Sequence, residues 1–153
     1  MKRIQFSVLN CDGVPSTNLD KLDQLVTHVR QNHVTVLVET RVSDLTPLTV
    51  HLDTHSKCFH NTVDFEGRRG QGAASFVHNS LTDLVRIWKV SDAIQAVWIK
   101  VCGSAFGVGG QVILGAIYIN PQSSTRSGIH IGQMFSDLQL EISEAQANRS
   151  HYF

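Results

Sequence analysis

The chain opens with two short apolar runs. In residues 4–9, Ile4, Phe6 and Val8 alternate with other residues and share one face, and a second run extends without a charged residue from Val34 to Val38. Runs of this length, bounded by turn-forming residues, are typical of β-strands. The first run ends at Asn-Cys-Asp-Gly and the second at Glu-Thr, so each predicted strand delivers polar groups at its carboxyl end.

The segment between the two runs has the spacing of an amphipathic helix. Its apolar residues recur every three or four positions, which predicts a helix from Leu19 to about Gln31 with Asn18 as its cap. A strand–helix–strand crossover of this length predicts that the two strands pair in parallel. The apolar stripe of the predicted helix consists of Leu19, Leu22, Leu25, Val26 and Val29.

The rest of the chain shows a polar loop, several short strands and a second helix. Residues 41–54 are polar, with Pro47 as a breaker, and strands are predicted at residues 58–65, 73–78, 84–90, 94–102 and 112–119. Residues 129–147 carry Ile131, Phe135, Leu138 and Ile142 at helical spacing. We therefore predict an α/β fold in a single domain over residues 1–153, with an unstructured tail at residues 148–153.

Polar and acidic side chains collect at one predicted edge of the sheet. Asn10, Asp12 and Glu39 follow the two parallel strands at their carboxyl ends, which is the edge where ligands bind in open α/β sheets. Carboxylate and amide oxygens are the ligands that Mg²⁺ prefers. A plainer alternative is that Glu39 pairs with Arg41, and that Asn10 and Asp12 only form the turn.

Four segments resemble one known family. The strings SVLNCDGVP (residues 7–15), VTVLVETR (34–41), GRRGQGAASFVHNSL (67–81) and ILGAIYINPQ (113–122) are similar to the endonuclease/exonuclease/phosphatase superfamily. The sequence most resembles the endonuclease domain of LINE-type retrotransposon polyproteins, and the resemblance covers residues 4–147. The resemblance implies an incomplete two-sheet α/β sandwich that cleaves phosphodiester bonds with Mg²⁺.

The resemblance also assigns roles to individual residues. It makes Glu39 the metal-binding glutamate, with Asn10 and Asp12 beside it, and makes Tyr118 the tyrosine that contacts the scissile phosphate. Asn120 follows this tyrosine, while Arg68 and Arg69 stand at a predicted hairpin tip where arginines can contact a phosphate backbone. The alternative for Tyr118 is an ordinary half-buried strand tyrosine, and for the arginines a solvated turn.

Two motifs of the family, Gly-Asp-Phe-Asn and Ser-Asp-His, do not occur in the sequence. We therefore expect a fragment of a nuclease domain that is inactive alone, with DNA as the family substrate. Its expected partner is the missing half of the domain or a reverse transcriptase domain of a longer polyprotein. The alternatives are a non-catalytic remnant or binding module, and a phosphodiesterase of the same superfamily that acts on small molecules or lipids.

Composition narrows this picture only slightly. The formal net charge is +0 with 13 basic and 13 acidic residues, which is unusual for a free-standing DNA-binding domain. No CxxC pair, signal peptide or membrane-length run is present, so an intracellular location, nuclear or cytoplasmic, without a membrane partner is expected. Four potential zinc ligands lie within ten residues, so a zinc site is an alternative to a solvated loop and strand edge there: His51, His55, Cys58 and His60.

Overall fold

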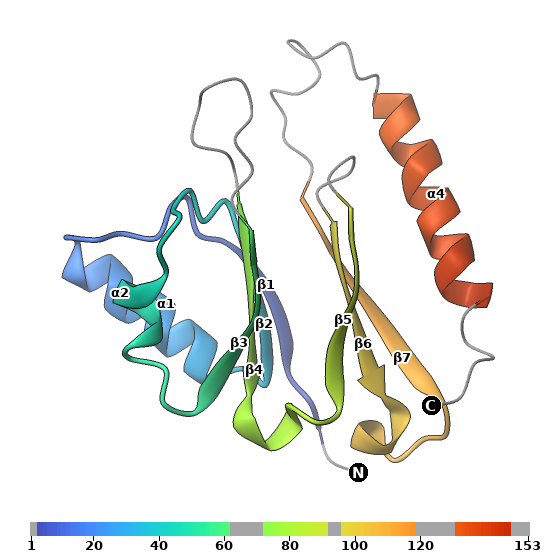
Figure 1. Ribbon diagram of the computed structural model, residues 1–153, viewed down its shortest axis with the longest axis horizontal. Coiled ribbons are helices and arrows are strands. Elements are labelled where there is room, and N and C mark those ends of the chain that lie inside the picture. Colours follow the sequence, from blue (N-terminus) through green and yellow to red (C-terminus); the bar gives the residue numbers. More distant parts are fainter. Residues whose placement is uncertain (1–2, 62–71, 92–95, 119–130, 148–153) are drawn as a thin grey trace. The chain divides into compact units, whose positions relative to one another are not determined.

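The protein is a mixed α/β chain with a four-stranded and a three-stranded sheet (Figure 1). The computed structural model describes residues 3–61, 72–91, 96–118 and 131–147. The chain divides into two compact units, residues 1–86 and 87–153, and the boundary falls near the start of the fifth strand. Within the described ranges, no helix is both long enough and apolar enough to span a lipid bilayer.

The first unit is built on the predicted crossover. It contains β1 (Phe6–Asn10), α1 (Leu19–Arg30), β2 (Val34–Val38), β3 (His55–Asn61) and β4 (Ala73–His78). The sheet order is β1-β2-β4-β3, and β1 and β2 pair in parallel, as predicted. The β2–β4 and β4–β3 pairs are antiparallel. The edge strand β1 and its neighbour β2 therefore end at the same side of the sheet.

The helix α1 confirms its predicted cap and most of its predicted apolar stripe. The Asn18 side-chain oxygen accepts a hydrogen bond from the Lys21 backbone N–H at 3.0 Å. Four of the five stripe residues are buried, but Leu19 is 72% exposed. The stripe prediction is wrong at Leu19, because this first helical residue lies one turn before Leu22, where the buried cluster begins.

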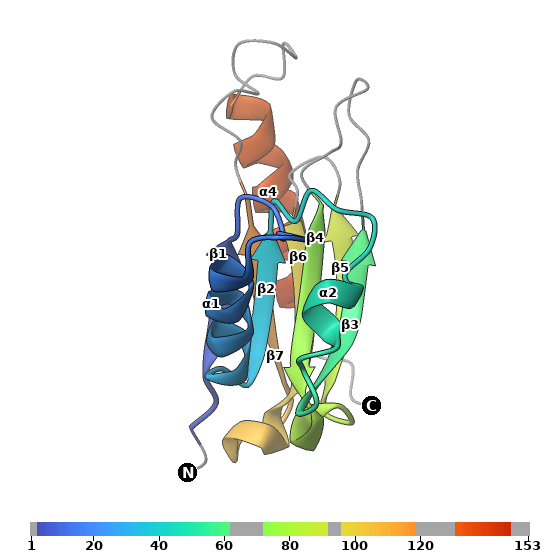
Figure 2. The ribbon, with the colours of Figure 1, turned by 90° about the vertical axis from the view of Figure 1, so that its left-hand side faces the viewer.

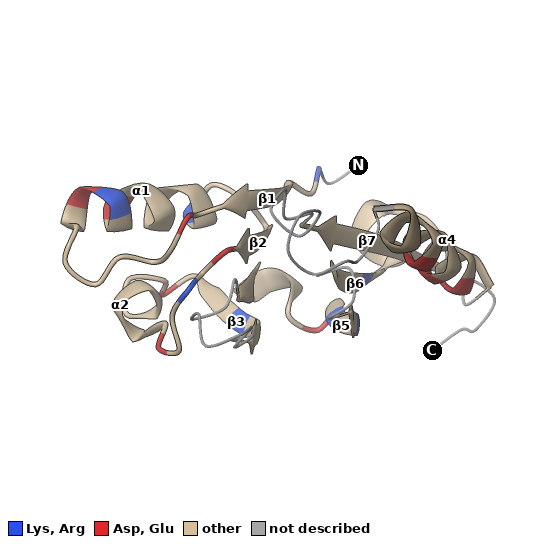
Figure 3. Cartoon of the chain, turned by 90° about the horizontal axis from the view of Figure 1, so that it is seen from above, with Lys and Arg blue, Asp and Glu red and all other residues tan. Residues whose placement is uncertain are grey.

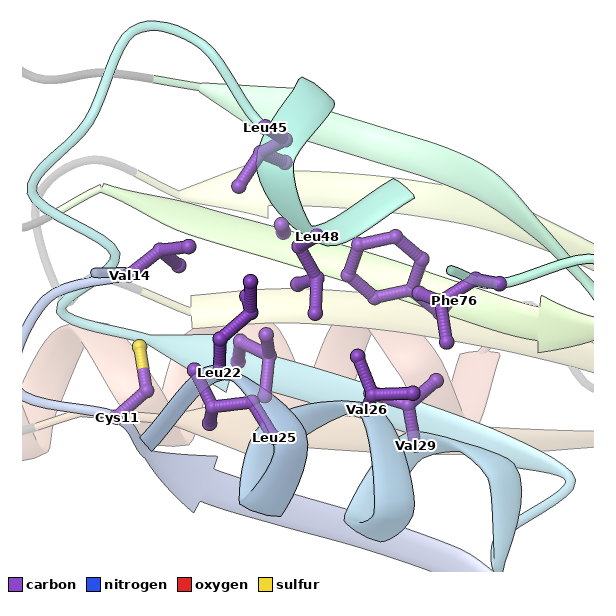
Figure 4. Close-up of a cluster of buried hydrophobic side chains, with 12 residues drawn as sticks. Cys11, Val14, Leu22, Leu25, Val26, Val29, Leu45, Leu48 and Phe76 are labelled. Atoms are coloured by element: carbon purple, nitrogen blue, oxygen red, sulfur yellow. The ribbon is translucent and has the colours of Figure 1, made fainter. Parts of the chain in front are cut away.

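Helices cover one face of the four-stranded sheet and form the core there (Figure 2). Side chains of α1 meet Phe76 from β4 and Leu48 from the short helix α2 (Thr46–Thr49), as Figure 4 shows. The prediction of a loop over residues 41–54 is wrong at α2. Pro47 stands in the first turn of α2, where its missing N–H costs nothing, so it starts a helix here instead of interrupting one.

Three histidine rings lie close together in the first unit. His55 is buried, with ring centroids 5.1 Å from His78, and His78 is 6.1 Å from His33. The Nε2–H of His55 donates to the Asn32 carbonyl oxygen at 2.8 Å, and its Nδ1 lies 3.0 Å from the Thr54 hydroxyl. Burial lowers the pKa of His55, and the nearby charges also act in this direction.

Acid is expected to destabilise the first unit through His55. An unfolded histidine has a pKa of about 6.5, and burial followed by the charges of His78, His33 and Arg30 lowers the pKa of the folded His55. Below pH ~6.5 the unfolded chain therefore binds a proton that the folded chain excludes, and stability falls by up to ~1.4 kcal/mol per unit of pKa difference. Urea unfolding at pH 7.5, 6.5 and 5.5 measures this slope.

The test variant is His55→Gln, and the matched control is His51→Gln, because His51 is exposed. The substitution at His55 should flatten the pH dependence, and the one at His51 should leave it unchanged. A free energy of unfolding that stays constant or rises toward pH 5.5 would show that the environment of His55 does not penalise its charged form.

The second unit is a small sheet with one helix. It contains β5 (Val85–Ser91), β6 (Ala96–Cys102), β7 (Gln111–Ile117) and α4 (Ile131–Ala147), in the sheet order β5-β6-β7. The β6–β7 pair is antiparallel, with Ala96 opposite Ile117 and Cys102 opposite Gln111. The predicted strands and helix are all present, with boundaries that differ by one or two residues within the described ranges. Residues 148–153, the predicted tail, lie outside those ranges.

The helix α4 packs through only part of the apolar stripe that the sequence predicts, since Leu138 packs against the buried cluster of the second unit. Phe135 is 55% exposed and Ile142 is 41% exposed, so the predicted stripe is wrong at both residues. The buried positions include Met134 and Glu141, and the Glu141 carboxylate accepts a 2.6 Å hydrogen bond from the Trp98 indole N–H. A polar residue thus marks the packed face, because a partner on β6 satisfies it.

Candidate functional site

The backbones that leave β1 and β2 stay hydrogen-bonded beyond the ends of the strands. Asn10 is opposite Val38 in the parallel register, and the Cys11 N–H donates to the Val38 carbonyl oxygen at 3.0 Å. Two further bonds follow, from the Gly13 N–H to the Glu39 oxygen at 2.7 Å and from the Val14 N–H to the Thr40 oxygen at 2.8 Å. Residues 10–14 and 38–40 are therefore held side by side at the carboxyl edge of the sheet.

Three non-glycine residues at this edge have left-handed backbone conformations. The φ angles are +45° at Asp12, +55° at Glu39 and +53° at Arg41. Each costs about 1–2 kcal/mol relative to the right-handed form, so the surrounding bonds must compensate for it. Acidic and basic stretches lie near one another where β1 and β2 end (Figure 3).

One guanidinium group joins the two predicted carboxylates. Arg41 Nη1 lies 2.6 Å from Asp12 Oδ1, and Arg41 Nη2 lies 2.5 Å from Glu39 Oε2. The Glu39 side chain is 8% exposed, whereas those of Arg41 and Asp12 are 48% and 71% exposed. The structure thus brings Asp12 and Glu39 together around a single positive group, and the predicted pairing of Glu39 with Arg41 is present.

Asn10 and Cys11 shape the turn that carries Asp12. The Asn10 side-chain oxygen accepts from the Asp12 backbone N–H at 2.9 Å, which is the predicted turn-forming role of this residue. The Lys21 ammonium donates to the Asp12 carbonyl oxygen at 2.9 Å. The Cys11 thiol donates to the Val38 carbonyl oxygen at 3.2 Å, and burial raises the pKa of this thiol, so it remains a neutral packing group.

Sequence reasoning missed two residues behind the carboxylates. The Thr40 hydroxyl is fully buried and finds no hydrogen-bond partner within the described part of the chain. Gly72 lies against it, since a Cβ at Gly72 would stand 2.4 Å from the Thr40 oxygen and 3.0 Å from the Asn61 carbonyl oxygen. Gly72 also has a φ of +53°, so the close approach and the backbone conformation both require glycine there.

The remaining predicted site residues lie in the second unit or outside the described residues. Tyr118 belongs to the second unit, where it directly follows β7 and is half-buried, as the plainer alternative for it predicts. Arg68, Arg69 and Asn120 lie outside the described residues, so their predicted contacts with substrate stay predictions.

The alternative zinc site does not form among the residues that the structure covers. No group of three or more histidine, cysteine, aspartate or glutamate side chains is arranged there to hold a metal ion. His55 and His60 instead lie within hydrogen-bond distance of the carbonyl oxygens of Asn32 and Val42. His51 and Cys58 are exposed, and the β3–β4 register shifts between Lys57 and Phe59.

The carboxylate pair and its bridging arginine are the clearest candidate site in the described structure. Two acidic groups from neighbouring parallel strands share one cationic position at the edge where α/β sheets bind ligands. Comparison with known proteins adds no relative from which a role can be transferred: no protein-family model matches the sequence, and no curated protein matches it significantly.

Proposed function

We propose that this chain is part of an endonuclease of the endonuclease/exonuclease/phosphatase type, from a retrotransposon-like polyprotein. In this proposal the carboxyl edge of its four-stranded sheet binds a divalent cation. The observation that supports this most is the placement of Asp12 and Glu39 on one positive group at the ends of two parallel strands. An α/β chain with two sheets is consistent with the proposal. The choice of this family rests on the resemblance of the four sequence segments.

Under this proposal the cation is a hard one such as Mg²⁺, because the candidate donors at this edge are oxygen atoms. These donors are the carboxylates of Asp12 and Glu39 and the amide oxygen of Asn10, which accepts from the Asp12 backbone N–H. The pairing of the Arg41 guanidinium with both carboxylates supports the proposal, because it places positive charge at this edge. In the proposed site Glu39, held nearly buried, and Asp12, on the exposed side, hold the ion.

When bound, Mg²⁺ would supply Lewis-acid polarisation of a phosphate group and offset charge on the leaving oxygen. The family resemblance gives Tyr118, in the second unit, the role of a hydrogen-bond donor to a phosphate. The family's Asp, Asn and His residues that position and activate the nucleophile belong to motifs absent from this sequence. Groups that act as a unit fail as a unit, so we propose metal binding without turnover by this chain alone.

Titration with Mg²⁺ tests the proposal. The wild-type chain should bind one Mg²⁺ in isothermal titration calorimetry, and Glu39→Gln should abolish binding, because it removes the charge of the most buried ligand. Asp53→Asn is the matched control, since Asp53 is an exposed carboxylate that pairs with Arg30 away from the site. Supercoiled plasmid should remain intact under the same conditions.

Two results would overturn the proposal. Binding that is equal in the wild type and Glu39→Gln would place the cation elsewhere. Mg²⁺-dependent nicking that disappears in Glu39→Gln would leave the metal site standing and contradict the proposed lack of turnover.

A second candidate function is a non-catalytic binding module with the same fold. The arginine bridge favours it, because both carboxylates already have a cationic partner, Arg41, within the chain. The same titration separates the two candidates, since a module whose cluster is only structural binds no Mg²⁺. For either candidate we propose an intracellular setting, which the three free thiols Cys11, Cys58 and Cys102 support.

We propose DNA as the substrate of the assembled nuclease. The partner of this chain is then the part of the protein that carries the Gly-Asp-Phe-Asn and Ser-Asp-His motifs, or a reverse transcriptase domain of the same polyprotein. Both assignments derive from the family resemblance of the four sequence segments.

A further inference from the structure

The edge strand β3 has one buried side chain, and that side chain is a histidine. Within the described sheet, β3 pairs with β4 alone, at the edge opposite β1 (Figure 2). Of its seven residues, His55 is buried, the next three are exposed and the last three are half-buried. A strand with so few buried contacts opens more readily than the core does. The attachment of β3 therefore depends strongly on the residues that hold its ends.

A histidine ring holds β3 to a neighbouring loop near each of its ends. At the start of the strand, His55 Nε2 lies 2.8 Å from the carbonyl oxygen of Asn32, in the turn between α1 and β2. Near the other end, His60 Nε2 lies 3.1 Å from the carbonyl oxygen of Val42, in the segment that follows β2. The two rings thus connect the edge strand to the chain before and after β2.

The surroundings of His55 disfavour its charged form. Burial lowers the pKa of this ring, and the hydrogen bond to Asn32 offsets the effect only in part. Neighbours from three other segments act in the same direction as burial: His78 on β4, His33 in the turn before β2 and Arg30 on α1. The centroids of the His55 and His78 rings are 5.1 Å apart, so a positive charge on each would repel the other.

His60 has surroundings of the same kind. Burial is again the main cause that lowers the pKa of the ring, and Lys57 on the same strand adds to the effect. The Val42 carbonyl and the Asp44 carboxylate oppose this effect without reversing it. Both histidines of β3 therefore bind a proton at a cost in the closed strand, and water would solvate the charged rings if the strand detached.

We propose that β3 is a proton-releasable edge strand, which detaches from β4 in mild acid while the core of the first unit stays folded. This inference does not depend on the proposed metal site. A histidine whose pKa is lowered in the closed strand binds a proton more readily in the open one, so opening becomes more favourable as the pH falls below about 6.5. Detachment makes β4 the edge strand, and its backbone groups on that side become available to another strand.

The pH dependence of release has an expected size. Between pH 7.5 and pH 5.5, one ring that binds its proton only in the open state raises the open fraction up to about 10-fold, and two such rings raise it up to about 100-fold. Hydrogen exchange followed by NMR on the full chain measures this as a fall in the protection factors of the β3 amides. Protection factors already correct for the intrinsic pH dependence of exchange.

His55→Gln and His60→Gln test the two rings separately. Glutamine keeps an N–H donor and carries no charge, so each single variant should retain a fall of up to about 10-fold, and the double variant should show none. His51→Gln is the matched control, because His51 is exposed and precedes β3, and it should behave as the wild type does. Constant protection of β3 in the wild type, or a full fall in the double variant, would overturn the proposal.

The response to urea separates strand release from unfolding of the whole unit. Release exposes little surface, so exchange of the β3 amides should not depend on low urea concentrations, whereas the amides of the buried strand β2 should exchange faster as urea is added. Amides of β3 and β2 that respond to urea alike would show that no strand is released by itself.

Titration of the histidine rings in the wild type serves if the double variant does not fold. Ring resonances that give His55 and His60 a pKa below the ordinary histidine value of about 6.5 would support release, because both rings then favour the open strand on protonation. A pKa at or above this value for both rings would contradict it.

Discussion

Phe76→Ala is expected to destabilise the first unit by about 3–5 kcal/mol, which is a large part of the stability of a small domain. Among the described residues, Phe76 is the largest fully buried side chain, and it packs against the apolar face of α1 and against Leu48 of α2 (Figure 4). Its removal leaves a cavity that helices on one side and a sheet on the other cannot fill. Urea unfolding followed by circular dichroism gives the change in free energy.

Phe135→Ala provides a control with the same chemical change. Phe135 is 55% exposed on α4, and alanine favours helix, so this substitution should change stability by less than ~1 kcal/mol. Equal losses from both substitutions would mean that the core around Phe76 is not packed as described, or that the exposed face of α4 is covered.

Trp98→Ala should destabilise the second unit by about 3–5 kcal/mol. Trp98 is 6% exposed on β6, packs with Met134 of α4 and stacks edge-to-face with Trp88 at 6.1 Å between ring centroids. It also donates to Glu141, a nearly buried carboxylate that Lys89 contacts at 3.3 Å. The substitution removes the central side chain of this core and one partner of a buried acid.

Trp98→Phe separates packing from the hydrogen bond. Phenylalanine retains most of the ring but leaves Glu141 without its indole donor, so a loss of about 1–3 kcal/mol is expected. Amide hydrogen exchange in α4 measures both variants, since α4 should open more readily in each. An α4 that exchanges as slowly in Trp98→Ala as in the wild type would contradict the packing of this helix on β6.

The sequence predicted element bounds best where a strand is fully buried and turn-forming residues mark its ends. The bounds of β2 and β4 agree with the predicted runs, because β2 is buried throughout and β4 is buried at its four central positions. The helix α2 could not be found by periodicity, since four residues are too few to show one. The buried face of α4 was hidden because Glu141 is stabilised by Trp98, 43 residues earlier in the chain.

The sequence predicted which acidic residues lie at the candidate site, but it did not predict how the side chains are arranged there. Parallel pairing of two strands is enough to bring Asp12 and Glu39 to one edge. The arginine bridge and the positive φ angles at its three residues are not indicated by any sequence pattern. The contact of Thr40 with Gly72 joins residues 32 positions apart, and only the folded sheet reveals it.

The left-handed backbone at Asp12, Glu39 and Arg41 sets two evolutionary pressures against each other. Glycine at any of the three would relieve backbone strain and raise stability. The same change would delete a charge from a cluster in which Arg41 pairs with both acids. Selection for stability alone would therefore favour replacement of Asp12, Glu39 and Arg41 by glycine. A lineage that keeps all three charged residues accepts a loss of stability, and the reason must lie in the charges themselves.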